Sequence, residues 1–446
     1  MQPQLAALLT VVLIIYLFWM DRNNNKGFSK ALWVPFVWMY FTRSRNISEW
    51  LDLQTPDPSL SMTSIIEGNP LNRNIYTALL ILGIFALIKR KIDWRTIFVK
   101  NSWIWLYFIF GAISIFWSDY PYVSFKRLIK ASCVVIMALV ILTEARPYLA
   151  IGLILKRLAF ILLPLSVLFI KYYPEFGRAY HHSTGELMST GVTSHKNALG
   201  ALCLVSGIYF LWNLFWGGKK EGDAGPRLHF SIYMIMFVML FWLFRMANSA
   251  TSLACMVVTI LLFTIAKHPA FVRNPSKLIV FGIVCVVIAG LSEMTFGIKE
   301  YVIELLGRKP DLTTRVPMWE HVLNLTVDPI FGAGYESFWL GERLAIIQAR
   351  WGDIVQAHNG YLEMYLNMGL VGVFFIICWI FSGLLSVNRH LSIDYPSANL
   401  RLCLIVVVAL YNYTEATFYG PNVMWLLFFI GIITLPNYKP KINQNV

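Results

Sequence analysis

The chain has 446 residues, of which 57% are hydrophobic and 14% are charged, and its formal net charge is +13. A soluble protein of this length does not need so much apolar surface, so the composition indicates a helical membrane protein. The positive charge would suggest a nucleic-acid partner in a soluble protein, but here lysine and arginine in cytoplasmic loops account for most of it.

Thirteen apolar runs approach the length needed to cross a hydrocarbon core of roughly 30 Å. They predict an all-α, polytopic membrane protein with about 12–13 transmembrane helices. The lower number applies if the second run, which is short, does not cross the membrane. The first run has no basic start and no small-residue cleavage site, so we expect a membrane helix rather than a removed signal peptide. The runs are residues 5–20, 29–41, 75–88, 102–117, 124–142, 149–170, 197–216, 230–244, 249–266, 277–291, 361–385, 400–414 and 418–434.

The distribution of lysine and arginine predicts which side of the membrane each connection faces. The connections rich in these residues are expected in the cytoplasm, and they are 89–100, 217–227, 267–277 and the tail after Pro436. The alternate connections then face outward, and they are 42–74, 118–123, 171–196 and 292–357. The predicted parts of the chain are N-terminal membrane helices (1–291), one large periplasmic loop (292–357), and C-terminal membrane helices with a cytoplasmic tail (358–446).

The outward connections nevertheless contain basic residues, which runs against the rule that sorts positive charge to the cytoplasm. These residues are Arg178, His195, Lys196, Arg308, Lys309, Arg315, Arg343 and Arg350. Lys126, Arg127 and Lys130 also open a predicted span on the outer side. Such side chains either extend to the membrane interface or line a polar cavity that receives an anionic headgroup.

His358 stands just before the predicted span 361–385, and Asn359 and Gly360 are suited to begin a helix. A helix N-terminus disfavours imidazolium and favours bound anions. A neutral imidazole near a phosphate suits a general base that takes a hydroxyl proton. Tyr361 and Tyr365 follow on the same helix face. The competing interpretation is an interfacial histidine beside a belt of tyrosines.

Three further charged residues are candidates for contact with substrate. Arg315 could hold a pyrophosphate through paired hydrogen bonds, although a single loop arginine is more often simply solvated. Lys196 places a cation at the outer interface, where it could also extend to the lipid headgroups. Glu415 lies near the outer end of an apolar span, and acids in such positions are usually paired and often functional.

Several motifs are missing from the sequence, and their absence argues against some chemistries. There is no Walker loop, no G-x-G-x-x-G opening a helix, no H-E-x-x-H and no C-x-x-C, so ATP hydrolysis, nicotinamide chemistry and zinc proteolysis are not expected. No Asp-x-Asp pair offers a metal site. The cysteines have no ligand spacing and are predicted to be core residues; they are Cys133, Cys203, Cys255, Cys285, Cys378 and Cys403.

Six segments together resemble the O-antigen ligase and polysaccharide polymerase superfamily, and most of all its exopolysaccharide polymerase branch. Each segment is weak alone, but their order and spacing from about Ser102 to the last span make the match fairly specific. The segments are FWSDYP at 116–121 with Arg127 following, HKNALG at 195–200, NSATS at 248–252, LTTR at 312–315 with Trp319, PIFGAGY at 329–335, and HNGYLE at 358–363.

The resemblance implies glycosyl transfer at the outer face of a bacterial inner membrane. The donor would be an undecaprenyl-diphosphate-linked glycan, the acceptor a hydroxyl of a glycan, of lipid A core or of a protein, and no metal, nucleotide or other cofactor would be needed. On this pattern Arg315 clamps the diphosphate and His358 is the general base. The residues to which we assign substrate binding are Arg178, Lys196, Arg127, Asn359, Tyr361 and Glu415.

Two departures from the family pattern concern arginine. The place beside Gly191 is Thr190 rather than arginine, and Arg178, earlier in the same connection, is the candidate replacement. The usual Thr-Gly-Arg is Thr313-Thr314-Arg315, which keeps the arginine but changes its turn.

The alternative class of function is a transporter or flippase of lipid-linked saccharides. It predicts pseudo-symmetric halves with broken helices at corresponding places, and the sequence shows no such repeat. An outward cavity holding both Arg315 and His358 would favour the enzyme. The residues name neither the sugar nor the acceptor, so polymerase and ligase both remain open.

Overall fold

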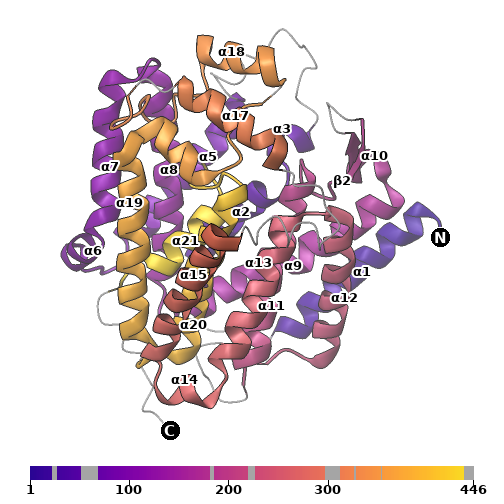
Figure 1. Cartoon of the computed structure of the whole chain (residues 1–446). Coiled ribbons are helices and arrows are strands. Elements are labelled where there is room, and N and C mark those ends of the chain that lie inside the picture. The colour runs from indigo at the N-terminus through magenta and orange to yellow at the C-terminus, as the bar shows by residue number, and fades with distance from the viewer. Residues whose placement is uncertain are drawn as a thin grey trace.

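The computed structural model describes residues 1–22, 28–51, 69–180, 185–218, 227–296, 312–325, 328–352 and 354–435. Helices packed side by side make up almost all of this part (Figure 1). Within it, β1 (Arg178–Tyr180) and β2 (Leu187–Ser189) form one antiparallel pair with Arg178 opposite Ser189. The predicted all-α fold class is confirmed.

Every predicted apolar run contains a helix, although the last helix begins later than expected. These helices are α1 (Pro3–Asp21), α2 (Trp33–Arg43), α5 (Pro70–Ile88), α7 (Ser102–Ser114), α8 (Pro121–Leu142), α9 (Pro147–Tyr172), α11 (Lys196–Trp216), α12 (Phe230–Ala247), α13 (Ala250–Ala266), α15 (Ser276–Phe296), α19 (Gly360–Leu391), α20 (Tyr395–Thr414) and α21 (Val423–Ile432). Other helices lie between them: η2 (Lys30–Leu32), α3 (Ile47–Trp50), α6 (Trp94–Lys100), η4 (Ile115–Trp117), α10 (Pro174–Gly177), α14 (Pro269–Arg273), α17 (Leu312–Asn324) and α18 (Gly341–Trp351).

The helix starts follow from local sequence. Proline occupies the first turn of α5, α8, α9 and α20, where its missing N–H costs no hydrogen bond. Asn69, Asp394 and Asn422 cap α5, α20 and α21 by accepting a hydrogen bond from a first-turn amide.

In the described part of the chain, seven helices are long and apolar enough to cross a membrane. The bent pair α6 and α7, whose axes differ by 82°, raises the number to eight if it forms one span. Three shorter apolar helices are α13, Ser276–Cys285 and α21. The chain is therefore a multi-pass membrane protein, but fewer helices pass this length test than the thirteen runs predicted.

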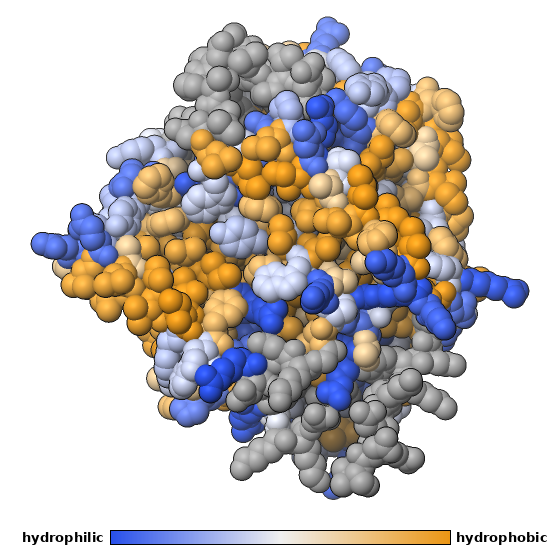
Figure 2. All heavy atoms as spheres, turned by 180° about the vertical axis from the view of Figure 1, so that it is seen from behind, coloured by the Kyte–Doolittle hydropathy of each residue, from blue (hydrophilic) through white to orange (hydrophobic). Residues whose placement is uncertain are grey.

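The buried centre of the bundle consists of α9, α11, α20 and α21, whereas α1, α5 and α12 lie at its periphery. One face shows a broad area of hydrophobic surface, with hydrophilic residues gathered above and below it (Figure 2). A buried ion pair of 2.5 Å between Lys156 and Asp21 joins α9 to the peripheral α1. The hydrophobic surface suits contact with lipid. The ion pair agrees with the expectation that charges inside a membrane bundle are paired.

Some of the connections predicted to face opposite sides lie at opposite ends of the bundle. Figure 1 shows α3, α10, β2, α17 and α18 at the upper end, and α14 at the lower end. The first group belongs to the predicted outward connections and α14 to a predicted cytoplasmic one. The helix α6, in the predicted cytoplasmic connection 89–100, lies about half-way up one side, so the full separation of the two sets and the side that each end faces stay predictions. Residues 297–311 of the predicted loop lie outside the described part.

The predicted span 361–385 is interrupted at Gly369, whose φ of 61° and ψ of −159° are not helical. The amide of Leu370 donates to the carbonyl of Pro329 (2.9 Å), and that of Val371 donates to Ile330 (3.2 Å). Backbone from the upper connection therefore replaces two helical hydrogen bonds. A Cβ at position 369 would lie 2.1 Å from the Ile330 carbonyl oxygen, so only glycine fits.

A second hydrophobic core lies at the upper end, separate from the large core of the bundle. It is built by α17, α18, residues 328–340 and the first part of α19. Its buried members are Met318, Val322, Ala333, Phe338, Trp339, Leu344, Ile347, Ala357 and Leu366. The segments around Arg315 and His358 are therefore folded against one another, which gives both residues a fixed support.

The cysteine prediction holds in part. All six cysteines are free, four are buried, Cys378 is half-buried and Cys285 is exposed. The expectation that every cysteine is a core residue is wrong for Cys285, because an apolar run marks contact with lipid as well as with protein.

Candidate functional site

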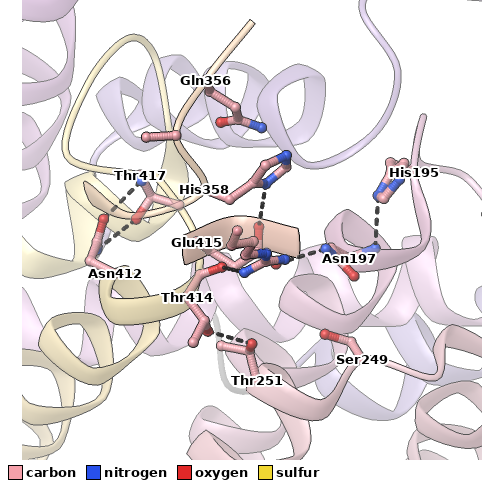
Figure 3. Close-up of polar contacts among 12 residues, drawn as sticks. His195, Asn197, Ser249, Thr251, Gln356, His358, Asn412, Thr414, Glu415 and Thr417 are labelled. Atoms are coloured by element: carbon pink, nitrogen blue, oxygen red, sulfur yellow. Dashed lines mark hydrogen bonds and ion pairs between the residues drawn. The ribbon is translucent and has the colours of Figure 1, made fainter. Parts of the chain in front are cut away.

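Five segments that are far apart in the sequence meet at the upper end of the bundle. They are the starts of α11, α13 and α19, the helix α17, and the last residues of α20 with the connection that follows. Figure 3 shows His195, Asn197, Thr251, His358 and Glu415 arranged around one place. We call Asn197, Arg315, His358, Thr414 and Glu415 the upper cluster.

Glu415 lies at the centre of the upper cluster, at the C-terminal end of α20. One carboxylate oxygen, Oε1, accepts a hydrogen bond of 2.7 Å from Asn197 Nδ2. The other, Oε2, lies 3.9 Å from Nδ1 of His358. The side chain is largely buried, with 12% of its surface exposed. The acid predicted near the outer end of a span is therefore paired, and it faces the histidine.

His358 has one protected and one accessible side. Its φ of 51° lies in the left-handed region, which turns the chain immediately before α19. Nδ1 is buried and makes no hydrogen bond within the described residues, whereas 31% of the side chain is exposed. If the Nδ1 proton faces Glu415, Nε2 is left as an acceptor. Such an imidazole can take a proton from a hydroxyl group.

Asn359 begins α19, as the sequence predicted. Its Oδ1 accepts hydrogen bonds from the amides of Tyr361 (3.0 Å) and Leu362 (3.1 Å). The first amide of the helix, Gly360 N, donates to the Glu415 carbonyl (3.1 Å). These donors are satisfied by the protein, so the start of α19 does not offer them to an anion.

Gly360 is required by a close approach between α19 and α20. A Cβ at this position would lie 2.1 Å from Asn412 Oδ1. That oxygen accepts a hydrogen bond of 2.8 Å from the Thr417 amide and cannot move away without losing it. In the H-N-G sequence, His358 makes the turn, Asn359 caps the helix and Gly360 allows the close contact with α20. Of the three side chains, only that of His358 is left for a role in chemistry.

Arg315 reaches the upper cluster from α17. Its Nη1 donates to the Thr414 carbonyl (2.7 Å) at the end of α20, where a cation is favourable because helix carbonyls point outward there. The contact uses one of the five guanidinium N–H groups. Thr414 is also bonded through its hydroxyl to Thr251 (2.6 Å). Arg315 and His358 therefore contact consecutive residues of one helix end.

Two predicted binding residues have other partners. Tyr361 donates its hydroxyl to the Ala409 carbonyl (2.9 Å), and its ring packs edge-on against Phe418 with centroids 5.6 Å apart. Arg178 is exposed, and its Nε donates to the Ile170 carbonyl (3.0 Å). Its cross-strand neighbour is Ser189, so Arg178 lies beside the position that departs from the family pattern. Among the described residues, neither side chain makes a hydrogen bond or an ion pair with the upper cluster.

Lys196 and Arg127 are separated in the structure. Lys196 is half-buried at the start of α11, immediately before Asn197 of the upper cluster. Arg127 belongs to a second group, where its guanidinium donates to the backbone carbonyl of Glu336. Glu336 Oε1 accepts from the Gly420 amide (2.9 Å). Burial raises the pKa of Glu336, and the nearby cations of Arg127 and Lys130 oppose that rise.

The connection between α20 and α21 joins the two groups. It begins with Glu415 and contains Tyr419, whose hydroxyl donates to Gln356 Oε1 (2.7 Å) two residues before His358. Burial and the neighbouring carboxylates raise the pKa of Tyr419. No sequence pattern singled out Gln356, Tyr419 or Glu336.

Two arginines at the end of α2 were also missed. Arg43 is buried and donates to Asn422 Oδ1 (3.0 Å), while its Nε and Nη1 make no hydrogen bond in the described part of the chain. Arg45 donates to the Thr193 carbonyl (3.4 Å), close to the HKN segment. Their position in the predicted outward connection 42–74 was the available signal, since basic residues there needed the same explanation as Arg315.

Two hollows in the described part of the chain are lined by residues outside the upper cluster. One, of about 390 Å³, is lined by Trp117, Asp119, Asp328, Phe331, Gly332 and Ala333. The other, of about 520 Å³, is apolar and is lined by Ile109, Ala112, Ile113, Ile115, Phe116, Phe125 and Leu128. Neither contains Arg315 or His358, so these hollows are not the common cavity that was expected. Among the residues described, no three His, Cys, Asp or Glu side chains gather closely enough to hold a metal ion.

Comparison with known proteins connects part of the chain, including two residues of the upper cluster, to a family. Residues 233–377, which include Arg315 and His358, match the family described as O-antigen ligase. The resemblance to the O-antigen ligase family is confirmed. Asn197, Glu415 and Arg127 lie outside the matched segment.

Two relatives are similar to a longer part of the chain than that segment. The chain is 26% identical over 373 residues to the exopolysaccharide production protein ExoQ of Rhizobium meliloti (strain 1021), covering 78% of this chain and 81% of the relative. It is 21% identical over 228 residues to a protein named "Putative polysaccharide ligase" from Rickettsia felis (strain ATCC VR-1525 / URRWXCal2), covering 48% of this chain and 54% of the relative.

Proposed function

We propose that the chain transfers a glycan from an undecaprenyl-diphosphate carrier to an acceptor hydroxyl, in exopolysaccharide polymerisation or O-antigen ligation. The reaction takes place at the periplasmic face of a bacterial inner membrane. The observation that carries the proposal is the contact of Arg315 with Thr414 and of His358 with Glu415, consecutive residues at one helix end. The similarity to the O-antigen ligase family and the names of both relatives support it.

The proposed reaction is a direct displacement. The acceptor oxygen attacks the anomeric carbon, the bond from that carbon to the lipid diphosphate breaks, and the diphosphate leaves with the electron pair. Nε2 of His358 takes the hydroxyl proton, and Arg315 hydrogen-bonds the departing diphosphate. Direct attack inverts the anomeric carbon. The chain's own residues supply the acid–base and charge requirements, so no metal is needed on this path.

The other members of the upper cluster prepare His358 for this role. The carboxylate of Glu415 faces Nδ1 and stabilises the imidazolium that forms when the proton is taken. Asn197 holds the carboxylate by its other oxygen, so that Oε2 remains directed to the histidine. Lys196 adds positive charge beside them for an anionic donor.

A transfer assay tests the proposal. Purified protein in lipid vesicles is given an undecaprenyl-diphosphate-linked glycan, an acceptor glycan or lipid A core, and excess chelator. We expect a longer or ligated glycan together with released undecaprenyl diphosphate. Transfer that returns only when Mg²⁺ is added contradicts metal independence, and no transfer to either acceptor under any condition contradicts the function.

Thiol labelling tests the side of the membrane. In a cysteine-free variant, Glu342→Cys on α18 and Arg273→Cys on α14 place single exposed thiols at the two ends of the bundle. In intact spheroplasts a membrane-impermeant reagent should label residue 342, and residue 273 should react only after lysis. The reverse pattern places the upper cluster in the cytoplasm and contradicts the proposed site of transfer.

A further inference from the structure

The hollow of about 390 Å³ beside η4 has a composition suited to carbohydrate, and we call it the aromatic hollow. The rings of Trp117 and Phe331 line it with centroids 5.7 Å apart and planes inclined by 60°. Both rings are partly exposed. The volume of the hollow is within the range of small-molecule binding sites, and the exposed faces of the two rings give it an open apolar surface.

Charged groups stand beside these rings. Asp119 forms an ion pair with Arg343, whose Nη1 is buried and has no hydrogen-bond partner within the described residues. Oδ1 of Asp328 accepts hydrogen bonds from the amides of Ile330 (2.7 Å) and Phe331 (3.0 Å), which leaves its second oxygen outside these two contacts.

This combination matches a sugar ring better than a lipid headgroup. The apolar C–H face of a pyranose can pack on an aromatic ring, while its hydroxyls can donate to the carboxylates of Asp119 and Asp328, which line the hollow. Two carboxylates, Asp119 and Asp328, would repel a phosphate group placed among them. The hollow therefore does not suit the diphosphate of the donor.

The aromatic hollow is connected to the upper cluster through α19. The Ala333 amide, at the edge of the hollow, donates to the Leu366 carbonyl (3.1 Å). Residues 360–366 of α19 span about 9 Å at 1.5 Å per residue. The reacting position and the hollow are thus reached from different turns of α19, so a glycan that reacts at His358 and also fills the hollow must bridge more than one helical turn.

We propose that the aromatic hollow binds a sugar unit of the glycan chain at a distance from the unit that reacts. The inference rests on the proposed transfer function and gives a role to the FWSDYP and PIFGAGY segments, which the transfer step does not use. It makes the hollow a specificity site, which selects the glycan without contacting the reacting atoms.

Photo-crosslinking tests the site without requiring transfer. p-Benzoyl-phenylalanine is placed at position 117, at position 356 beside His358, or at position 103, in a His358→Ala chain expressed in cells that make the glycan. Trp103 is the matched control because it is 37% exposed, against 38% for Trp117, and also packs against a phenylalanine. After irradiation, adducts are stained for carbohydrate.

We expect carbohydrate-positive adducts at positions 117 and 356 and none at position 103. Capture at 356 with only lipid, or nothing, at 117 overturns the sugar site and leaves the transfer function standing. No capture at either position counts against both. Carbohydrate at 103 as well shows unspecific contact and also overturns the site.

Kinetics with the active enzyme provide a second test. Trp117→Ala and Asp328→Asn should each raise KM for a long glycan about ten-fold with kcat little changed, because the reacting atoms are not touched. Asparagine keeps the Oδ1 that accepts from the two amides, so the connection stays folded. Trp103→Ala should leave KM unchanged. An unchanged KM in both hollow variants overturns the proposal.

Discussion

The two ends of the α19–α20 pair each carry a histidine and an arginine, yet they differ in how fully these groups are bonded. At the lower end, Arg401 donates to the Gly431 carbonyl (2.9 Å), the Ser386 hydroxyl (3.0 Å) and the Ile433 carbonyl (3.2 Å), and lies 3.4 Å from His390 Nδ1. At the upper end, His358 and Arg315 each make one contact with the last residues of α20.

The difference indicates that the lower pair stabilises the fold, whereas the upper pair is suited to chemistry. Arg401 satisfies carbonyls at the C-terminal end of α21, which would otherwise be left without donors in an apolar environment. His358 instead has a buried Nδ1 that makes no hydrogen bond to any described residue and lies beside a carboxylate, and part of its ring is exposed. Incompletely bonded polar groups at a protein's surface are the ones that remain available to a substrate.

The largest expected difference between the two ends is in the histidines. His358→Ala should lower kcat for glycan transfer by roughly 10²–10⁴-fold, the usual contribution of a general base, and leave membrane insertion intact. His390→Ala is the control, and it should leave the rate per folded molecule within about two-fold. Normal product from the His358→Ala chain would remove the base from this position.

Substitution of the two arginines should affect different properties: the transfer rate for Arg315 and the stability for Arg401. Arg315→Lys keeps the charge but loses the paired geometry, so transfer should fall about ten-fold or more. Arg401→Lys should lower the melting temperature while the folded enzyme keeps its rate. A rate for Arg315→Lys within about two-fold of wild type would show that the arginine is only solvated, and the diphosphate would then need Arg178, Lys196 or Arg127.

A smaller effect is expected from Glu415→Gln. Glutamine still accepts the hydrogen bond from Asn197 but carries no charge toward His358, so kcat should fall by roughly three- to ten-fold. KM for the donor should not change if Glu415 acts on the histidine. A rise in KM with kcat unchanged would instead assign Glu415 to substrate binding.

The smallest effect concerns the dependence of stability on pH. Burial raises the pKa of Glu336, so the folded chain holds this proton more tightly than the unfolded chain does. Its stabilising contribution is present at acid pH and is lost as pH rises through the folded-state pKa. Glu336→Gln carries no proton, so its melting temperature relative to wild type should increase from pH 5 to pH 8. A relative melting temperature that falls over this range contradicts the raised pKa.

The sequence predicted the helices well because membrane spans need long apolar runs. It could not predict the break at Gly369, because that break depends on backbone from residues 329–330 filling the gap. A glycine in an apolar run is equally compatible with a continuous helix.

The site was predicted in part for a related reason. His358 and Glu415 were found because charged or titratable residues beside apolar spans are few and need an explanation, and Arg315 because other basic residues share its outward connection and because the segment resembles the family pattern. Asn359 was assigned to substrate as well as to the helix start, and only the structure shows its oxygen bonded to two amides. Glu336 was missed because its importance comes from Arg127 and Gly420, which are distant in the sequence.

The break in α19 has a mechanical consequence. Separating the upper connection from the membrane helix would leave the amides of Leu370 and Val371 without acceptors, at a cost of about 1–3 kcal/mol for each buried group. These two hydrogen bonds therefore oppose separation of the connection from the lower part of α19. A tilt of residues 370–391 in the bilayer displaces Phe331 with it, so the lipid environment and the aromatic hollow are coupled through a single peptide segment.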